Sequence, residues 1–362
     1  MKKYKVGILG ATGMVGQRFV QLMDGHPWYD LTVLAASPRS AGKTYAQAVD
    51  GRWAMDTPIP AAIKDLVVLS AETDIETIAS QVDFVFSAVD MKKEEIFALE
   101  EAYAKAECPV VSNNSAHRHT ADVPMIVPEL NANHAEIIHA QRKRLGTQRG
   151  FIAVKSNCSL QSYMPALFPL YQQYGLEHAT VCTYQAISGA GKTLESAPEI
   201  TDNVIPFIGG EEEKSEQEPL KLLGTVGESG IENATDLSIT AQCVRVPVSD
   251  GHLAAVFMYF NPEKGVPSLA EVKAAWAGVK ACDLPSAPKQ FIHYFEEENR
   301  PQTRLDRNLE NGMAISVGRL REDKLYQFKF VCLSHNTLRG AAGGAVLMAE
   351  LLCDQGYISP KN

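Results

Sequence analysis

The chain has 362 residues, of which 45% are hydrophobic and 21% are charged, values ordinary for a globular protein with two domains. Its net charge of -9, from 34 basic and 43 acidic residues, argues against a basic surface for nucleic acid. No segment reaches the roughly 18 consecutive apolar residues of a membrane helix. A small anionic ligand would therefore have to be held by individual arginines and lysines.

Seven cysteines are scattered along the chain, and none of them forms a Cys-x-x-Cys pair. This distribution predicts neither a disulfide framework nor a zinc site, and it suits a reducing compartment. Residues 1–8 lead into a predicted strand without the apolar core of a signal peptide. We therefore expect a cytoplasmic protein.

The first half alternates short apolar strands with helical segments. The predicted strands are 6–9, 31–36, 67–69, 82–88 and 108–112, and the predicted helices are 17–23 and 94–105. Strands that alternate with helices are typical of a parallel sheet with crossover helices. We expect an α/β protein whose residues 1–157 form a Rossmann-like, doubly wound nucleotide-binding domain.

The pattern changes to longer apolar strands in the second half. A strand at 151–154 closes the first half, and strands are expected after it at 179–186, 253–260 and 325–333, with Tyr326, Phe328 and Phe330 on one face of the last one. They favour a mixed or antiparallel sheet in an α+β domain over residues 158–337. The acidic run from Glu211 predicts the first turn of a helix, since carboxylates favour that position. Residues 338–362, with a small-residue helix at 341–352, are expected to complete the first domain.

The glycine loop after the first strand indicates a dinucleotide site, because it ends a strand and opens a helix. Gly10 and Gly13 allow the backbone to approach a pyrophosphate, Gly16 permits close helix–strand packing, and Thr12 adds a hydroxyl donor. The other candidate cofactor contacts near the strand ends are Met14, Val15, Ser87 and Ala88.

The segment after the second strand indicates which dinucleotide binds. An NAD-binding domain places an acidic residue there for the ribose 2′-hydroxyl. This chain instead has Arg39 between Ser37 and Ser40, which suits a 2′-phosphate and so predicts NADP. The alternative is an ordinary Ser-Pro turn with a solvated arginine.

Cys158 lies between a predicted strand and a predicted helix that begins at Ser159. The positive end of the helix dipole is expected to lower the pKa of its thiol. His252 follows Gly251 at a turn before a strand, where the imidazole can reach a cleft. A thiol, an imidazole and a dinucleotide site predict hydride transfer to or from a carbon held on sulfur. His117 and His119, in a polar loop, remain alternative histidines at this stage.

Several motifs in order along the chain carry a resemblance to a known family. They are residues 10–18, 37–43, 122–124, 127–129, 156–159, 184–191, 202–203, 211–214, 243–248 and 251–252. With them the chain resembles the aspartate-β-semialdehyde dehydrogenases of archaea, fungi and some bacteria, nearly from end to end.

The resemblance implies roles for single residues. It implies Cys158 as the nucleophile and His252 as the general acid/base. The implied substrate-binding residues are Gln185, Arg245, Glu211 and Asn157, and the implied phosphate-binding residues are Arg118 and Lys214. Asn157 could equally cap the following helix. The implied contacts near the nicotinamide are Ser188, Gly189 and Asn336. His335 is a departure, because the family usually has an acidic residue before this asparagine.

The implied reaction is the NADPH-dependent reductive dephosphorylation of β-aspartyl phosphate to L-aspartate-β-semialdehyde through a cysteine thioester. This reaction serves lysine, methionine and threonine biosynthesis and needs no metal. The resemblance also implies a homo-oligomer, a tetramer or a dimer. Two alternatives remain, a malonyl- or succinyl-CoA reductase and an NADP-binding redox sensor without turnover.

Overall fold

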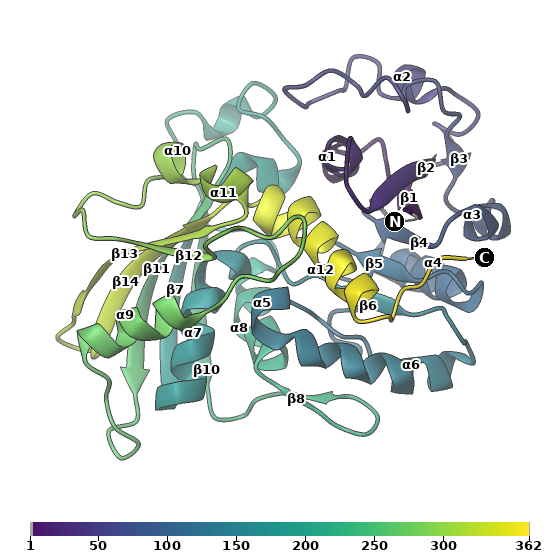
Figure 1. The fold of residues 1–362 in the computed structure, drawn as a ribbon. Helices are drawn as coiled ribbons and strands as arrows, with labels where there is room; N and C mark the ends of the chain where they lie inside the picture. Colours follow the sequence, from purple (N-terminus) through teal and green to yellow (C-terminus); the bar gives the residue numbers. More distant parts are fainter. Residues whose placement is uncertain (1–2, 362) are drawn as a thin grey trace.

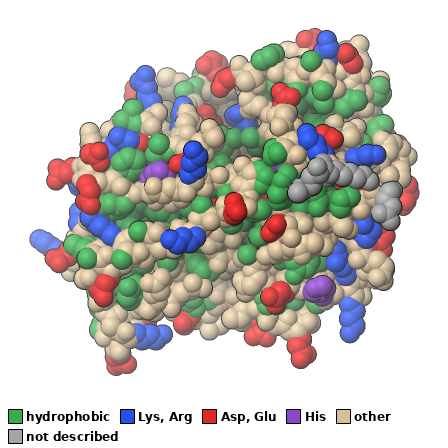
Figure 2. All heavy atoms as spheres, viewed as in Figure 1, with side chains coloured by type: hydrophobic (Ala, Val, Ile, Leu, Met, Phe, Trp, Pro, Cys, Tyr) green, Lys and Arg blue, Asp and Glu red, His purple; other side chains and the backbone are tan. Residues whose placement is uncertain are grey.

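The computed structural model describes residues 3–361, in which two six-stranded sheets lie side by side (Figure 1). Met1, Lys2 and Asn362, which belong to the predicted first domain, lie outside the described residues. None of the helices in residues 3–361 is long and apolar enough to cross a membrane. Acidic and basic side chains are interspersed over the face drawn in Figure 2.

The first sheet is entirely parallel, with strand order β3-β2-β1-β4-β5-β6. Its strands are β1 (Tyr4–Leu9), β2 (Tyr29–Ala36), β3 (Leu69–Ser70), β4 (Phe84–Ser87), β5 (Val110–Ser112) and β6 (Ile152–Val154). The helices of this half are α1 (Met14–Met23), α2 (Tyr45–Ala48), α3 (Ile75–Gln81), α4 (Lys93–Lys105), α5 (Pro128–Asn131) and α6 (Ile138–Leu145). The predicted doubly wound architecture is confirmed.

Several predicted boundaries of this half were wrong for local reasons. Val67 is 54% exposed and forms only an isolated bridge to Thr44, so the third strand begins at Leu69. Cys108 precedes β5, because its N–H donates to the carbonyl of Tyr103 at the end of α4. Helices α2, α3, α5 and α6 were not predicted.

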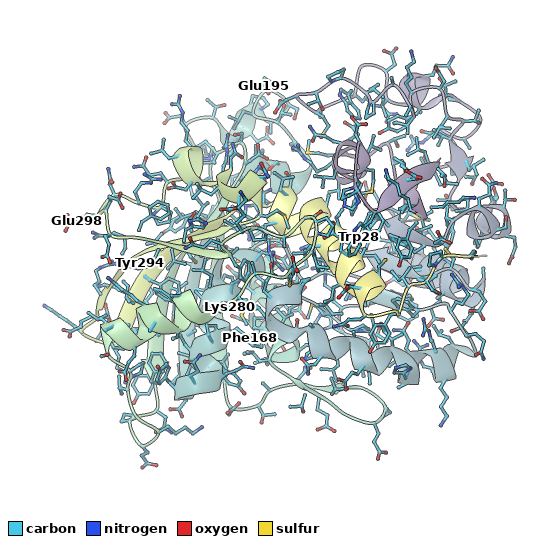
Figure 3. All side chains as sticks on the ribbon, in the orientation of Figure 1. Trp28, Phe168, Glu195, Lys280, Tyr294 and Glu298 are labelled. Atoms are coloured by element: carbon cyan, nitrogen blue, oxygen red, sulfur yellow. The ribbon has the colours of Figure 1, made fainter. Side chains whose placement is uncertain are left out.

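The second sheet is mixed, with strand order β10-β7-β11-β14-β13-β12. Its strands are β7 (Leu176–Gln185), β10 (Ser238–Arg245), β11 (His252–Phe260), β12 (Ile292–Phe295), β13 (Ile315–Glu322) and β14 (Phe328–Ser334). Helices α7 (Leu160–Tyr174) and α9 (Leu269–Gly278) cover one face of the sheet, where Phe168 and Tyr294 flank α9 (Figure 3). The opposite face is only half-buried, as the alternating burial along β11 shows.

The predicted common face of Tyr326, Phe328 and Phe330 was wrong. Phe328 and Phe330 point into the core, but β14 begins at Phe328 and Tyr326 lies in the preceding turn. The hydroxyl of Tyr326 hydrogen-bonds Thr180 at 2.8 Å, and its ring packs beside Phe257 on the half-buried face. The aromatic spacing alone could not show that the turn reverses this side chain.

The final helix, α12 (Gly343–Asp354), lies against the first sheet (Figure 1). Its apolar side chains share a buried cluster with Val6, Phe19 and Phe86 of the first sheet and α1. The helix is almost completely buried, and a π-helical turn (Leu338–Ala342) precedes it. The remaining elements are α8 (Glu211–Leu222), β8 (Thr225–Val226), β9 (Ile231–Glu232), α10 (Thr303–Asp306) and α11 (Leu309–Gly312).

The glycine loop generates the first testable prediction. A Cβ on Gly16 would lie 2.1 Å from the carbonyl oxygen of Gly10, so Gly16→Ala must push α1 away from the loop. We expect a loss of about 1–3 kcal/mol in the free energy of unfolding, measured by urea denaturation, together with weaker NADPH binding.

Gly13→Ala is the matched control, because the nearest atom to its added Cβ is 3.7 Å away. We expect its free energy of unfolding to stay within about 0.5 kcal/mol of the unmodified chain. Equal stability of the two variants would contradict the packing role of Gly16.

Candidate active site

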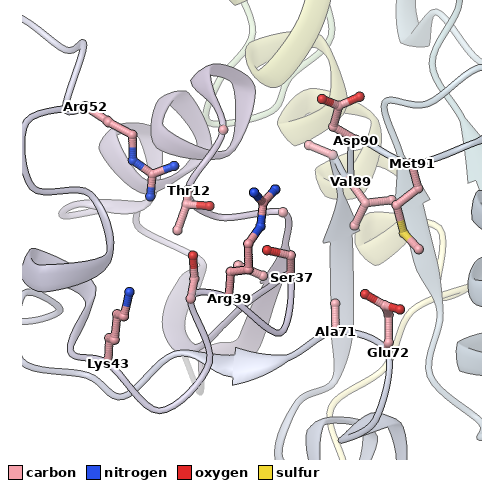
Figure 4. A pocket seen from close by; sticks show the side chains of 15 residues that line it. Thr12, Ser37, Arg39, Lys43, Arg52, Ala71, Glu72, Val89, Asp90 and Met91 are labelled. Carbon is pink, nitrogen blue, oxygen red and sulfur yellow. The ribbon is translucent and has the colours of Figure 1, made fainter.

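A cavity of about 390 Å³ opens at the carboxyl ends of β1, β2 and β4, the edge where doubly wound sheets bind ligands (Figure 4). Seven of the predicted cofactor residues line it, namely Gly10, Thr12, Gly13, Ser37, Arg39, Ser40 and Ala88. Figure 4 shows Arg39, Lys43 and Arg52 on one side of the cavity and Glu72, Asp90 and Met91 on the other. The last five of these residues were not predicted as cofactor contacts.

The remaining predicted cofactor residues lie elsewhere. Met14 lines a neighbouring cavity of about 240 Å³ together with Ser188, whereas Val15 packs against the core of the first domain. Ser87 is fully buried, and its hydroxyl accepts a hydrogen bond from the Asn114 amide at 3.0 Å.

The thiol and the imidazole meet between the two sheets. The Cys158 Sγ lies 3.3 Å from the Nε2 of His252, although 94 residues separate them in the chain. Cys158 follows β6 and directly precedes Ser159, the N-cap of α7, while His252 is the first residue of β11. The structure therefore brings together the two residues predicted to carry the chemistry.

A backbone amide beside His252 determines which ring nitrogen carries the proton. Its Nδ1 accepts a hydrogen bond from the N–H of Ala186 at 3.1 Å, and a backbone amide can only donate. The neutral imidazole therefore carries its proton on Nε2, facing the sulfur of Cys158. Burial, reinforced by the nearby Arg245, lowers the pKa of His252 to about 3, so the ring is neutral at physiological pH.

The predicted low pKa of the Cys158 thiol was wrong. Burial, followed by the negative charge of Glu211, raises the pKa of Cys158 above its ordinary value. The charges of Lys155, Arg118 and Arg245 oppose this increase only in part. The position before α7 is correct, but desolvation of the thiol outweighs the favourable end of the helix.

Glu211 gathers three of the predicted substrate-site residues at the beginning of α8. Its carboxylate accepts hydrogen bonds from Lys214 at 2.8 Å, from Asn157 at 3.0 Å and from Gln185 at 3.2 Å. Burial alone would raise the pKa of Glu211, but Lys214 and these amides outweigh it, so that the pKa is lowered and the group is ionised. Asn157 also accepts hydrogen bonds from the N–H and hydroxyl of Ser159, so it fixes the turn before α7.

Three neighbouring strands place Arg245, Gln185 and His252 together. Arg245 pairs with Gln185 in the register of β10 and β7, and His252 begins the adjacent β11. The Arg245 guanidinium donates to the carbonyl of Ala186 at 2.7 Å. A Cβ on Gly189 would lie 3.0 Å from this guanidinium and 3.1 Å from the His252 ring, so a side chain here would require both groups to shift by a few tenths of an ångström.

Arg118 is held by a residue that was not predicted. It donates to the Oε1 of Glu218 at 2.9 Å and to the carbonyl of Asn113 at 3.1 Å, while its buried Nε has no partner among residues 3–361. The Oε2 of Glu218 accepts the N–H of Asn157 at 2.6 Å. Glu218 therefore connects Arg118 to the backbone beside Cys158. The spacing of Glu211, Lys214 and Glu218 on one helical face was the available signal.

Asn336 joins two turns of the site. Its amide donates to the hydroxyl of Ser188 at 2.8 Å, and its Oδ1 accepts the N–H of Gly251 at 2.8 Å. The preceding His335 is buried, which lowers its pKa to about 4, and its Nδ1 accepts two backbone N–H groups. Neutral His335 thus organises this turn.

The two alternative histidines lie apart from this arrangement. His117 is buried against Phe97, with ring centroids 4.0 Å apart and its Nε2 3.2 Å from the Phe97 carbonyl. His119 is exposed. His252 is thus the predicted histidine that contacts the thiol.

Family models match both halves of the chain. Residues 5–138 match the NAD binding domain of semialdehyde dehydrogenases, and residues 167–339 match their dimerisation domain. The aspartate-semialdehyde dehydrogenase of Archaeoglobus fulgidus is 44% identical over 358 residues, which cover 98% of this chain and 100% of that protein. That of Saccharomyces cerevisiae is 42% identical over 369 residues, which cover 97% and 98% of the two chains.

A solved structure agrees with these relatives. The crystal structure of aspartate semialdehyde dehydrogenase with NADP from Candida albicans superposes with a TM-score of 0.88 at 38% identity, over 99% of this chain and 100% of that one. The two domain matches, the identity over nearly full length and the shared architecture lead to one conclusion. The chain belongs to the aspartate-semialdehyde dehydrogenase family.

Proposed function

We propose that the chain catalyses the NADPH-dependent reductive dephosphorylation of β-aspartyl phosphate to L-aspartate-β-semialdehyde, a step in lysine, methionine and threonine biosynthesis. The observation that carries the proposal is the 3.3 Å contact between Cys158 and His252, in a chain of this family. Arg245 and Glu211 lie beside this contact and offer opposite charges to the two charged groups of an amino acid.

The first cavity suits NADP. Gly10 has a φ of +83°, and a Cβ there would lie 2.3 Å from the carbonyl of Ala88, so the loop leaves its surface bare for a pyrophosphate. Arg39, with Ser37 and Ser40, would hold the 2′-phosphate. The other residues that we assign to the cofactor are Thr12, Gly13, Met14, Val15, Ser87, Ala88, Ser188, Gly189 and Asn336. When bound, NADPH supplies the hydride.

The substrate-binding roles follow from charge and hydrogen bonding. The planar guanidinium of Arg245 would bind the α-carboxylate, and the carboxylate of Glu211 would accept the α-ammonium group. Gln185 and Asn157 would hold the acyl group near the sulfur. Lys214 and Arg118 would bind the phosphate, and Glu218 limits where Arg118 can point.

The residues divide the chemistry between them. The thiolate of Cys158 attacks the acyl carbon, the carbon–oxygen bond to phosphate breaks, and a thioester forms. After hydride transfer, the Nε2–H of His252 donates its proton to the oxyanion of the hemithioacetal, which leaves the ring as an imidazolate beside the N–H of Ala186 and the charge of Arg245. The carbon–sulfur bond then breaks, the hydroxyl proton returns to His252, and the aldehyde and thiolate are released.

We also infer the organisation of the protein. Residues 1–157 with 338–362 would form the NADP-binding domain, and residues 158–337 the catalytic and oligomerisation domain. A homotetramer in the cytoplasm is the assembly and location that we propose. The half-buried face of the second sheet and the match to a dimerisation domain support association, and seven free thiols support a reducing compartment.

The deciding assay follows NADPH formation from L-aspartate-β-semialdehyde and NADP⁺, with and without inorganic phosphate. We expect turnover that depends on phosphate and disappears in Cys158→Ala, because no thioester can form. Turnover with malonyl-CoA or succinyl-CoA in place of the phosphate-dependent reaction would identify a CoA reductase. NADPH binding without any turnover would favour a redox sensor.

Replacing the imidazole tests proton donation. His252→Gln keeps a side chain of similar size but removes the titratable proton, so we expect kcat to fall by about 10²–10⁴. Steady-state kinetics would measure this decrease, with NADPH binding as the check on folding. A decrease of less than about tenfold would contradict the general acid role.

Arg245→Lys tests the carboxylate site. The variant keeps the positive charge but loses the bidentate fork, so we expect KM for the semialdehyde to rise by at least about tenfold. Arg39→Lys, in the cofactor cavity, is the control and should leave this KM unchanged when NADP⁺ is saturating. Wild-type KM in Arg245→Lys would show that another group binds the carboxylate.

A further inference from the structure

The segment of residues 113–123 carries Arg118, and it contains no regular helix or strand. Short-range hydrogen bonds form its turns, among them Arg118 N–H to the Ser115 carbonyl at 3.3 Å and Thr120 N–H to the His117 carbonyl at 3.0 Å. Each buried carbonyl of such a segment needs a donor from elsewhere in the molecule. The place of the Arg118 guanidinium therefore depends on groups outside the segment.

Lys221, in the last turn of α8, supplies three of these donors. Its ammonium group donates to the carbonyls of Arg118 at 2.9 Å, Thr120 at 2.6 Å and Val123 at 2.8 Å. An ammonium group has three N–H bonds, so the three carbonyls use all of them. Lys221 thus holds the main chain of the segment at three points.

This arrangement needs the charged form of the lysine, because a neutral amine has only two N–H bonds. Burial lowers the pKa of Lys221 to about 8, and the charges of Asp122 and Glu218 oppose this decrease. The ammonium form therefore prevails at neutral pH. The side chain is only 4% exposed, so water has little access to replace a lost donor.

Two further carbonyls of the segment accept hydrogen bonds from other elements. The Ala121 carbonyl accepts the N–H of Ile231 in β9 at 2.8 Å, and the Asp122 carbonyl accepts the Gln141 amide at 2.8 Å. Both hold the part of the segment that follows the guanidinium. Among these donors, Lys221 is the one that acts on the residue bearing the guanidinium itself.

Helix α8 holds Arg118 at both its side chain and its main chain. The Oε1 of Glu218 accepts from the guanidinium at 2.9 Å, and Lys221, three residues later on the same helical face, binds the Arg118 carbonyl. The guanidinium also donates to the Asn113 carbonyl at 3.1 Å. A displaced Arg118 main chain could not keep both side-chain bonds, so the contact with Lys221 sets where the side chain begins.

The lysine itself stands on a fixed support. The Asn131 amide donates to the carbonyl of Leu222 at 3.3 Å, and the Nε2 of His134 lies 3.0 Å from the carbonyl of Gly224. These contacts anchor the end of α8 to α5 and to the 3-10 turn that follows it. Loss of the ammonium group would therefore release the segment and leave the helix in place.

We propose that Lys221 is a positioning residue for the phosphate site, and that its ammonium group fixes residues 118–123 so that Arg118 presents its guanidinium to the phosphate. The proposal rests on the proposed function, in which Arg118 binds the phosphate. All three N–H bonds of Lys221 are taken by carbonyls, so it acts through Arg118 and not on the phosphate itself.

The test compares KM values for the three substrates of the phosphate-dependent oxidation. Lys221→Met keeps the aliphatic stem but removes every donor, so we expect the KM for inorganic phosphate to rise by at least about tenfold. The KM values for L-aspartate-β-semialdehyde and NADP⁺ should stay within about twofold, because Lys221 holds neither Arg245 nor the cofactor cavity.

Lys221→Gln is a milder variant, which keeps two N–H bonds without the charge. Its KM for phosphate should lie between those of the unmodified protein and Lys221→Met, and it provides the test if Lys221→Met does not fold. His26→Phe is the control for lost stability, because it breaks the buried 2.8 Å pair with Glu350 of α12. We expect this control to lower the thermal unfolding temperature and leave the KM for phosphate unchanged.

A KM for phosphate within about twofold of the unmodified protein in the folded Lys221 variants would overturn the proposal. A parallel rise of all three KM values would also overturn it, since general loss of structure would then be responsible. A rise of the KM for phosphate in His26→Phe would have the same meaning. Thermal unfolding and NADPH binding verify that each variant is folded.

A binding measurement separates this proposal from the proposed function. Absence of phosphate-dependent turnover in the unmodified protein would contradict the function. In that case, isothermal titration calorimetry of inorganic phosphate into the NADP⁺-loaded protein decides the role of Lys221. We expect the Kd for phosphate to rise by at least about tenfold in Lys221→Met. An unchanged Kd, or no phosphate binding to the unmodified protein, would overturn that role.

Discussion

The contact between Cys158 and His252 joins the two halves of the molecule. Cys158 stands after the last strand of the parallel sheet, whereas His252 begins a central strand of the mixed sheet. A distance of 3.3 Å between Sγ and Nε2 therefore requires both sheets and α7 to be in place. The cavity lined by Gly10 and Arg39 lies on the parallel sheet and the Gln185–Arg245 pair lies on the mixed sheet, so this junction connects the two sheets that carry them.

Helix α8 stabilises this junction through buried charges. Glu211, Lys214, Glu218 and Lys221 recur at intervals of three or four residues and so share one face. Glu218 ties Arg118 to the backbone of Asn157, and Lys221 donates to three carbonyls of the loop that follows Arg118. Removing one partner of such a buried pair typically costs about 3–5 kcal/mol, because the other charge is left without compensation. The helix thereby holds Arg118 and the thiol loop in a fixed relation.

Desolvation sets the electrostatics of the site. It raises the pKa of Cys158, lowers the pKa of His252 to about 3 and lowers the pKa of Lys155 to about 7. All three groups are therefore biased toward their neutral forms in the free protein. Burying neutral groups costs little desolvation free energy, and a charge on the Cys158 sulfur needs to develop only when the thiol reacts. Glu211 is the exception, because Lys214 and two amides stabilise its carboxylate.

Local patterns predicted the fold class and the strands of the parallel sheet, whereas β12 and β13 of the mixed sheet were not predicted. Alternating strands and helices, the glycine loop and the segment around Arg39 identified the parallel sheet and its cavity, because these features depend on neighbouring residues. Errors arose where a distant contact decides the outcome. Val67 follows a strand pattern yet forms only one bridge, and Tyr326 follows the aromatic spacing yet turns to Thr180 on the opposite face.

The sequence by itself determined the chemical groups of this protein, namely the thiol, the imidazole, the guanidinium groups and the glycine loop, together with its family. Residue types and their order are sufficient for that purpose. Only the tertiary structure decided the protonation states of these groups. The proton on Nε2 of His252 follows from an amide 66 residues away, and the lowered pKa of Lys155 follows from its burial. Hydrogen bonds and desolvation arise between segments far apart in the chain, so no local pattern encodes them.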